Sequence, residues 1–301
     1  MKYILAIPTY NGGEKWKEVA TAIRLNSREE VIVKVIDSGS TDDTVAIALE
    51  NGFDVVKINK SDFNHGGTRN LAFENIAETD IVIFLTQDAI PCAGFIDEIL
   101  LCFDDPSVAC AYGRQLPHRE ADAIAIHARN FNYAKDSYKY TLSDIEKKGI
   151  KTVFMSNSFS AYKVNIFTRL DGFPSHTILC EDMFYAAKAI KSGYSICYMA
   201  DAKVYHSHNY TAVDEFKRYF DIGVFHEKEP WIRELTGGLG GEGKKFVISE
   251  MKYLYRNKPG LIIKALLSTA MKFLGLKMGG HYSLFPVALV KKMSMHKGYW
   301  K

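Results

Sequence analysis

The sequence predicts an α/β fold in which helices flank both faces of a mostly parallel central sheet. Short apolar runs, including YILAI at 3–7, VIVKVI at 31–36 and IVIFL at 81–85, alternate with segments of helical periodicity. Apart from Lys34, these runs are continuously apolar, as in strands that are buried on both faces. With 301 residues and 47% hydrophobic content, the chain is long enough to bury such a core.

Strands and helices alternate through the first 112 residues. We expect strands at 3–7, 31–36, 55–58, 81–85 and 108–112, and helices at 14–25, 67–77 and 94–103. Polar clusters at 8–12, 37–43 and 86–88 each follow a strand. Open sheets bind ligands beyond the carboxyl ends of their parallel strands, so the three clusters should converge at one edge.

The middle of the chain is less regular. Residues 115–150 are polar and aromatic, and we interpret this stretch, which contains Tyr133, Tyr138 and Tyr140, as a mobile or substrate-facing insertion. A helix over 182–192 should end at Gly193, and a strand should follow at 195–199.

A glycine cluster at 237–243 predicts a linker. We therefore expect a domain over 1–240, with halves at 1–115 and 116–240, and a basic helical region at 241–301.

The basic residues are unevenly distributed. The net charge is +3, yet residues 251–301 hold ten Lys and Arg and no Asp or Glu, which leaves the first 250 residues at −7. A basic tail on an acidic body indicates an anionic partner, either a membrane surface or a nucleic acid. No nucleic-acid-binding module is recognisable, so we expect no nucleic-acid partner.

The tail contains one amphipathic pattern. Residues 261–276 are apolar except for Lys264, Ser268, Thr269 and Lys272, and three of these four form one helical stripe. We expect this segment to be too short and too charged to cross a membrane, and to form a basic interfacial helix. The alternatives are a helix packed on the protein body and the contact face of a homodimer.

Cysteine usage and the N-terminus indicate a cytoplasmic protein. The five cysteines are odd in number and none is spaced as C-x-x-C, which is typical of free thiols in a reducing compartment. The apolar run at 3–7 lacks the length and the cleavage site of a secretory leader.

Two acidic residues follow buried strands. A carboxylate at Asp37 can accept a hydrogen bond from the ring N–H of a pyrimidine base; its alternative role is a helix cap, for which Ser40 or Thr41 is better suited. Asp88 can hold a hard divalent cation beside a diphosphate, or simply occupy a loop.

The segment 65–70, HGGTRN, precedes a helix. Its glycines allow close backbone approach, the helix N-terminus favours anions, and Arg69 can pair with a diphosphate. Gly-rich turns are common, so this pattern alone identifies no ligand.

Further along, Glu181 and Asp182 open a helix, where acids also complement the helix dipole. A carboxylate there can instead take a proton from a sugar hydroxyl as a general base, and the residues alone leave both readings open. His206 and His208, two residues apart on an extended stretch, share a face that can bind a metal or a phosphate.

Three segments in order, AIPTYN at 6–11, IDSGSTD at 36–42 and ED at 181–182, resemble the family 2 glycosyltransferases. Within that family the chain is similar to bacterial rhamnosyltransferases of O-antigen-type polysaccharide synthesis. This narrower resemblance depends on FNHGGTRN at 63–70, LTQDA at 85–89, YHSHNY at 205–210, and SMH at 294–296 with Tyr299 and Trp300.

The resemblance implies a GT-A type, Rossmann-like fold, an inverting reaction and a divalent metal, Mg²⁺ or Mn²⁺. It implies dTDP-β-L-rhamnose as donor, a lipid-linked glycan as acceptor, and an enzyme peripheral to the inner face of the cell membrane. The first half of the domain would bind the nucleotide sugar and the second half the acceptor. The alternatives are another, UDP-linked donor, or a nucleotide-sugar-binding protein without activity.

The resemblance also implies roles for particular residues. Asp182 is the expected catalytic base and Asp88 the expected metal ligand. Beside the resemblance, we expect His206, or alternatively His208, to complete the metal site, and Glu181 and His208 to lie on the acceptor side or behind the ligands. The expected donor-binding residues are Pro8, Thr9, Tyr10, Asp37, Arg69, Gln87 and Asp88.

One departure from the family concerns the metal motif, usually Asp-x-Asp, which is Thr86-Gln87-Asp88 here. A rival class, the sugar nucleotidyltransferases, carries a related G-G-x-G-T-R loop directly after the first strand. Here the similar residues follow the third strand, which disfavours that class.

Overall fold

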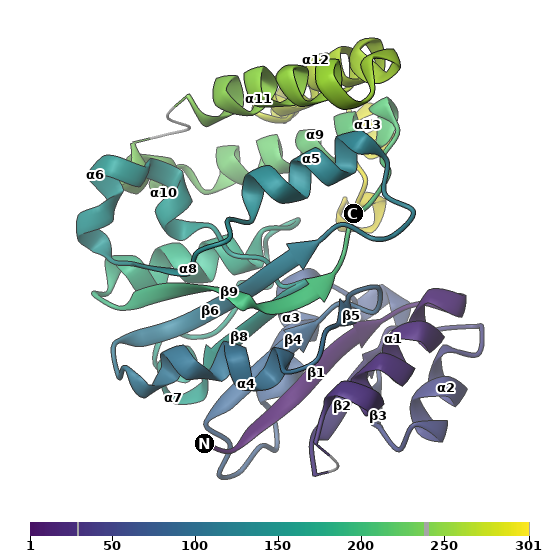
Figure 1. The fold of residues 1–301 in the computed structure, drawn as a ribbon, viewed down its shortest axis with the longest axis vertical. Coiled ribbons are helices and arrows are strands. Elements are labelled where there is room, and N and C mark those ends of the chain that lie inside the picture. The colour runs from purple at the N-terminus through teal and green to yellow at the C-terminus, as the bar shows by residue number, and fades with distance from the viewer. Residues whose placement is uncertain (29, 238–240, 301) are drawn as a thin grey trace.

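The computed structural model describes residues 1–28, 30–237 and 241–300 and confirms the α/β class (Figure 1). Within these residues the strands form one nine-stranded sheet in the order β3-β2-β1-β4-β8-β6-β9-β5, and β7 pairs with β9. The strands are β1 (Tyr3–Thr9), β2 (Ile32–Asp37), β3 (Asp54–Lys57), β4 (Ile81–Leu85), β5 (Ile90–Pro91), β6 (Val108–Leu116), β7 (Tyr138–Tyr140), β8 (Phe159–Lys163) and β9 (Ser195–Tyr205).

Helices cover both faces of this sheet (Figure 1). They are α1 (Gly13–Asn26), α2 (Thr44–Glu50), α3 (His65–Asn70), α4 (Phe95–Leu100), α5 (Ala123–Asn132), α6 (Ile145–Lys148), α7 (Val164–Arg169), α8 (Glu181–Lys191), α9 (Ala212–Lys228), α10 (Pro230–Thr236), α11 (Glu242–Asn257), α12 (Ile262–Gly279) and α13 (Val287–Met293).

Alternate residues of β1 belong to two apolar cores, which explains why this strand is apolar throughout. Leu5 and Ile7 pack in the core that contains Trp16 of α1, whereas Ile4 and Ala6 pack in the core on the other face. β1 pairs in parallel with β2 and with β4. The carboxyl ends of these three strands therefore meet at one edge, as predicted.

The sheet is mixed. β8, which the sequence did not reveal, runs antiparallel between β4 and β6, and β5 and β7 both run antiparallel to β9. Ile83 of β4 and Ala111 of β6 both pair with Ala161 of β8. A five-residue strand that contains a serine and a lysine carries a weak periodic signal, and its place depends on the two strands beside it.

The expected insertion at 115–150 is instead part of the packed fold, and the interpretation of Tyr133 as mobile or substrate-facing was wrong. Tyr133 is buried in the core, and Tyr138 lies on β7, where its hydroxyl hydrogen-bonds that of Tyr112 at 2.7 Å. Aromatic side chains here fill the space between the sheet and α5 rather than facing a ligand.

Two predicted boundaries also changed. α3 begins at His65, where Asn64 caps it, and ends at Asn70, followed by a 3₁₀ turn, Leu71–Phe73, instead of continuing to 77. Gly193 has a φ of 86° after α8, as expected of a residue that ends a helix. The centre of the predicted glycine linker, 238–240, lies outside the described residues.

The polar stripe of α12 faces the protein. Lys264 pairs with Asp122 at 2.8 Å, Lys272 pairs with Glu215 at 3.0 Å, and Ser268 is buried. On this side, α12 therefore packs against the protein body, which was one of the two alternatives to an interfacial helix. The expectation that the segment is too short to cross a membrane was wrong, because 259–279 is one helical stretch of sufficient length and apolarity.

Candidate active site

Three loops meet at the carboxyl edge of the parallel strands, as predicted. Thr9 donates a hydrogen bond from its hydroxyl to Asp37, which joins the loops after β1 and β2. The backbone N–H of Tyr10 donates to Oε1 of Gln87 at 2.8 Å, and Nε2 of Gln87 donates to the carbonyl of Tyr10 at 3.1 Å. These contacts build the expected edge from strands that are distant in sequence. Pro8, in β1, pairs with Ile36 of β2 beside them.

The carboxylate of Asp37 is 1% exposed and is fully used by its own loop. Oδ1 accepts from the backbone N–H groups of Gly39 and Ser40, and Oδ2 accepts from the hydroxyls of Thr9 and Ser40. A carboxylate has about four acceptor positions. The predicted contact with a base therefore requires one of the two hydroxyls to move aside.

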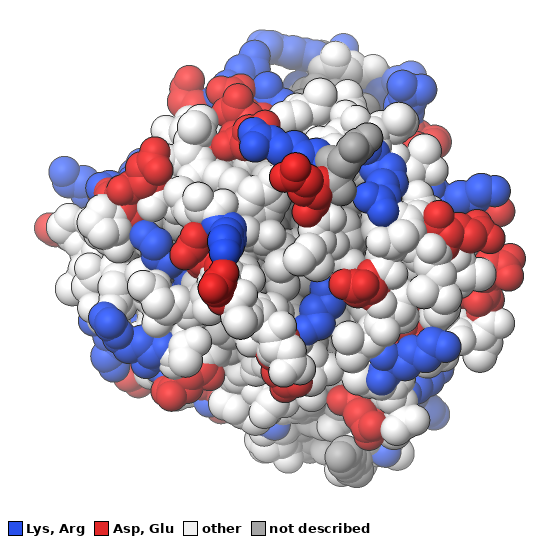
Figure 2. Space-filling model, turned by 90° about the horizontal axis from the view of Figure 1, so that it is seen from below, with Lys and Arg blue, Asp and Glu red and all other residues white. Residues whose placement is uncertain are grey.

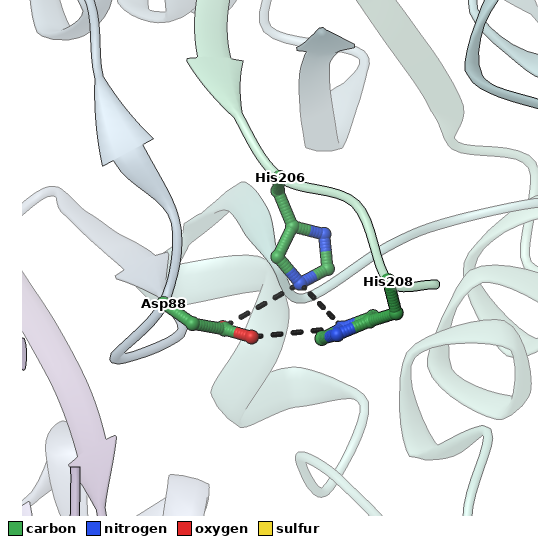
Figure 3. Close-up of side chains that lie close together, drawn as sticks. All are labelled: Asp88, His206 and His208. Carbon is green, nitrogen blue, oxygen red and sulfur yellow. Dashed lines mark hydrogen bonds and ion pairs between the residues drawn. The ribbon is translucent and has the colours of Figure 1, made fainter. Parts of the chain in front are cut away.

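Asp88, His206 and His208 form a cluster that can hold a cation (Figure 3). Nε2 of His206 lies 3.5 Å from Oδ1 of Asp88, Nε2 of His208 lies 3.5 Å from Oδ2, and the two Nε2 atoms are 3.1 Å apart. Ligands at right angles around an ion at about 2.1 Å stand roughly 3 Å apart, so the residues fit a small divalent ion. His208, expected near the acceptor, belongs to this cluster.

The protonation states of the cluster suit a cation. Burial alone would raise the pKa of Asp88, but the neighbouring imidazoles of His206 and His208 hold that pKa well below its ordinary range. Burial, and then the proximity of His206, lowers the pKa of His208 to about 4. At neutral pH the cluster thus offers a carboxylate and a neutral imidazole.

Two residues that the sequence did not single out orient His206. Oε1 of Gln115 accepts a hydrogen bond from Arg129, which identifies that atom as the amide oxygen. Nδ1 of His206 lies 2.9 Å from the same oxygen and must therefore donate to it. This tautomer leaves a lone pair on Nε2, the atom that faces Asp88, as a metal-binding histidine requires.

Glu181 and Asp182, at the start of α8, are both held by Asn157. The side-chain amide of Asn157 donates to Oε1 of Glu181 at 2.8 Å, and its backbone N–H donates to Oδ2 of Asp182 at 3.0 Å. The backbone N–H of Met183 donates to Oδ1 of Asp182 at 2.8 Å. Sequence reasoning missed Asn157; its only signal is a polar triplet, 156–158, between two more apolar segments.

The two acids of this pair differ in proton affinity. Burial, reinforced by the charge of Glu181, raises the pKa of Asp182 to about 7. Burial also opposes ionisation of Glu181, but the guanidinium of Arg69, 3.2 Å away, lowers the pKa of Glu181 overall. Glu181 is therefore ionised at neutral pH, whereas Asp182 gains and loses its proton near neutral pH, as a general base should.

Arg69 is buried beside Glu181 rather than exposed to a ligand. Gly66, in the same segment, allows close packing of two chain segments, because a Cβ there would lie 1.9 Å from the carbonyl oxygen of Pro174. The C-terminal segment reaches this region as well, since the rings of His65 and His296 approach to 3.4 Å between Nε2 and Nδ1.

One short loop connects the cation cluster to the acid pair. Nε2 of Gln115 donates to the hydroxyl of Ser156 at 2.7 Å, and the next residue, Asn157, contacts both acids. The cluster opens into a cavity of about 330 Å³, whose lining includes Asp88, His118 and His208.

The molecule combines a mostly parallel sheet, loops that converge at its carboxyl edge, a carboxylate–histidine cluster that fits a divalent ion, and a carboxyl with a pKa near neutrality. These features fit a GT-A type transferase. The chain belongs to glycosyl transferase family 2, whose pattern matches residues 4–170. It is therefore a glycosyltransferase, and enzymes of this fold commonly use divalent metals.

Two curated relatives match along their whole length. The chain is 51% identical over 302 residues to the O-antigen chain rhamnosyltransferase RfbN of Salmonella typhimurium, covering 100% of this chain and 96% of the relative. It is 50% identical over 300 residues to the O-antigen chain rhamnosyltransferase WbaN of Salmonella anatum, covering 99% and 95%.

Solved structures share the fold at low identity. The mannosyltransferase PcManGT of Pyrobaculum calidifontis, solved with GDP-Man and Mn²⁺, superposes with a TM-score of 0.56 at 19% identity and covers 99% of this chain and 84% of its own. S. aureus TarS 1–349 superposes with a TM-score of 0.54 at 16% identity, covering 94% and 91%.

Proposed function

We propose that this enzyme transfers L-rhamnose from dTDP-β-L-rhamnose to a lipid-linked glycan during synthesis of a cell-surface polysaccharide, with inversion at the anomeric carbon. One observation carries the proposal: over its whole length, the chain is 51% and 50% identical to two O-antigen chain rhamnosyltransferases. The cation cluster and the acid pair supply the two chemical functions that such a transfer needs.

Asp88, His206 and His208 would hold a Mg²⁺ or Mn²⁺ ion beside the donor diphosphate. When bound, the ion would neutralise the negative charge that develops on the leaving dTDP. Gln115 keeps His206 in the tautomer that binds a cation. Two imidazoles thus supplement Asp88, the one carboxylate of the cluster.

Asp182 acts as the base in this proposal. Its carboxylate takes the proton from an acceptor hydroxyl, whose oxygen forms the new bond to the anomeric carbon while the bond from that carbon to the diphosphate oxygen breaks. The pKa near 7 keeps a large fraction of Asp182 ionised at neutral pH and still allows it to accept a proton.

The loops after β1, β2 and β4 would hold the nucleotide. Tyr10 and Gln87 brace each other there, and Asp37 organises the loop against which the base would lie. Arg69 pairs with Glu181 through Nη1, while its Nε has no hydrogen-bond partner in the described part of the chain. Because this donor is buried, the proposed contact with the diphosphate requires the Arg69 side chain to move.

The acceptor places the enzyme at the inner face of the membrane, where a lipid-linked glycan would be extended. Cytoplasmic location and peripheral attachment both follow from this acceptor, and the basic tail is the part of the chain suited to anionic lipid.

A donor panel tests the proposal. The purified enzyme would be incubated with dTDP-rhamnose, UDP-sugars and GDP-sugars, with thermal shift as the measure of binding and release of nucleoside diphosphate as the measure of transfer. We expect stabilisation and turnover with dTDP-rhamnose and a product of inverted configuration by NMR. Turnover with a UDP-sugar alone would refute the donor, and binding without turnover on any acceptor would indicate a non-catalytic binding protein.

A further inference from the structure

The apolar side of α12 faces away from the protein. The inward side packs on α9 so closely that a Cβ on Gly275 or Gly279 would lie 2.3 or 2.0 Å from backbone oxygens of that helix. The opposite side carries exposed apolar residues at helical spacing, and Ile263 is 80% and Phe273 69% exposed. We call this set the outer stripe: Ile263, Leu266, Leu267, Phe273 and Leu274.

Exposed large apolar side chains also occur elsewhere in the C-terminal region. They lie on α11, on the turn after α12 and on α13: Ile248, Tyr255, Leu284, Val287 and Leu289. α11 and α12 form the outermost layer of the molecule at one end (Figure 1). Monomeric soluble proteins rarely expose so many large apolar residues on neighbouring segments without a partner for them.

Positive charge flanks the outer stripe at both ends. Lys258 precedes α12 and Lys277 follows the stripe; both are exposed, and neither forms an ion pair within the described ranges. The tail from 251 onward contains no Asp or Glu. On the face at the opposite end of the molecule, Figure 2 shows both signs of charge interspersed.

We propose that the outer stripe inserts into the headgroup region of an anionic bilayer, with α12 lying in the membrane plane as an anchor that does not span. Apolar side chains flanked by lysines fit a surface that is apolar below and anionic above. This inference rests on the proposed function and specifies which side of the molecule contacts the lipid.

The packing of α12 distinguishes an in-plane anchor from a spanning helix. Crossing the bilayer would separate Lys264 from Asp122 and Lys272 from Glu215, and would carry two ammonium groups into hydrocarbon. It would also uncover the surface of α9 that Gly275 and Gly279 now contact. With α12 packed on the protein, Lys264 and Lys272 keep their ion pairs, and the apolar side of the helix is free to contact lipid.

Charge also favours lipid over a second copy of the chain. In a symmetric dimer the same surface lies on both partners, so the acid-free basic tails would face each other and repel. An anionic bilayer instead attracts them.

The anchor adjoins the cation cluster. Lys264, near the start of α12, pairs with Asp122, whose backbone N–H donates to Oδ1 of Asn209 at 2.9 Å. Asn209 follows His208 directly and lines the same cavity. An acceptor whose lipid lies in the bilayer would therefore meet the active site at the edge nearest the membrane.

Vesicle binding by the full chain, without donor or acceptor, tests the proposal. Sedimentation would be measured with vesicles of equal parts phosphatidylethanolamine and phosphatidylglycerol, and with vesicles of phosphatidylcholine alone. We expect binding to the anionic vesicles to exceed binding to the neutral ones. The double variant I263S/F273S should bind the anionic vesicles at least about tenfold more weakly.

The matched control is L25S/L49S, which removes side chains of similar exposure, 78% and 60%, from α1 and α2 at the far end of the molecule (Figure 1). It should bind vesicles like the wild type. Equal loss in both double variants, or no loss in I263S/F273S, would overturn the proposal. A wild-type dimer that I263S/F273S converts to a monomer would also overturn it, in favour of a second copy.

An alkaline carbonate wash of cell membranes separates the two membrane modes. Release of the enzyme is expected of an in-plane anchor, and retention would show a spanning helix instead. Transfer to a soluble acceptor analogue should be unchanged in I263S/F273S, so a failure of the anchor and a failure of the proposed reaction give different results.

Discussion

His206 donates from Nδ1 to the amide oxygen of Gln115 at 2.9 Å, and this one contact decides which nitrogen of His206 faces Asp88. Orientation of a ligand by a neighbour is common in metal sites, where loss of the neighbour typically weakens metal binding about 10–100-fold. The cation site therefore includes a residue on β6, remote in sequence from both histidines.

Gln115→Met should weaken Mn²⁺ binding by about 10–100-fold, because Met cannot accept the hydrogen bond that selects the tautomer of His206. Titration of Mn²⁺ followed by electron paramagnetic resonance measures this affinity without any turnover. Gln115→Glu keeps an acceptor for His206 and Arg129, so its Mn²⁺ affinity should stay near that of the wild type. Equal affinity in the Met and Glu variants would contradict the role of the amide oxygen.

Removal of the metal should stop transfer. Chelation with EDTA should abolish activity, and added Mg²⁺ or Mn²⁺ should restore it. Asp88→Asn should lower kcat by about 100-fold or more, because the only carboxylate of the cluster is lost. Full activity in EDTA would show that the charge of the leaving group is neutralised by other residues.

Asp182→Asn should lower kcat by about 1,000-fold or more while donor affinity remains, because the amide cannot accept a proton. Isothermal titration with the donor and a transfer assay give the two readouts. The exposed Asp136 provides a matched control, and Asp136→Asn should leave both unchanged. Loss of donor affinity in Asp182→Asn would identify Asp182 as a binding residue instead.

Activity should depend on pH through Asp182. A base works in its ionised form, and burial beside Glu181 raises the pKa of Asp182 to about 7. The rate should therefore fall as the pH decreases through about 7, with the slope of a single proton. A profile of kcat against pH measures this limb. An acidic limb near pH 4, the ordinary range of a carboxyl, would show that the pKa of the working base is not raised.

Asn157→Ala should destabilise the protein by about 2 kcal/mol or more, because it leaves buried partners unsatisfied. Glu181 loses one donor, and the hydroxyls of Ser160 and Tyr162 lose their shared acceptor. Urea unfolding measures the change, and Asn132→Ala, at an exposed position of α5, should change stability by less than about 0.5 kcal/mol. A change in Asn157→Ala as small as in the control would show that these contacts are replaced by water.

Local patterns were sufficient for the parallel half of the fold. β1, β2 and β4 are apolar runs that end in polar clusters, and since parallel strands share one carboxyl edge, the convergence of Thr9, Asp37 and Gln87 follows from the order of elements. The pairing of Asp88 with His206 could also be predicted, from strand ends and from resemblance.

Partners that are distant in sequence could not be predicted in this way. Gln115, Arg129 and Asn157 carry no motif, and they matter because β6, α5 and the segment before β8 bring them to His206 and Glu181. β8 itself is defined by pairing on both sides rather than by its own composition.

The acidic residues show the same division. The sequence by itself determined which carboxylates stand at strand and helix ends, because backbone periodicity and chain order place Asp37, Asp88 and Asp182 there. Only the tertiary structure decided what each one meets: a closed loop for Asp37, two imidazoles for Asp88, and burial beside a second acid for Asp182. It also decided that Lys264 and Lys272 of α12 face inward, because Asp122, which caps α5, and Glu215 of α9 lie where those lysines arrive. Periodicity specifies the sides of a helix, whereas the side that turns outward depends on the charges and shape of the surface against which the helix packs.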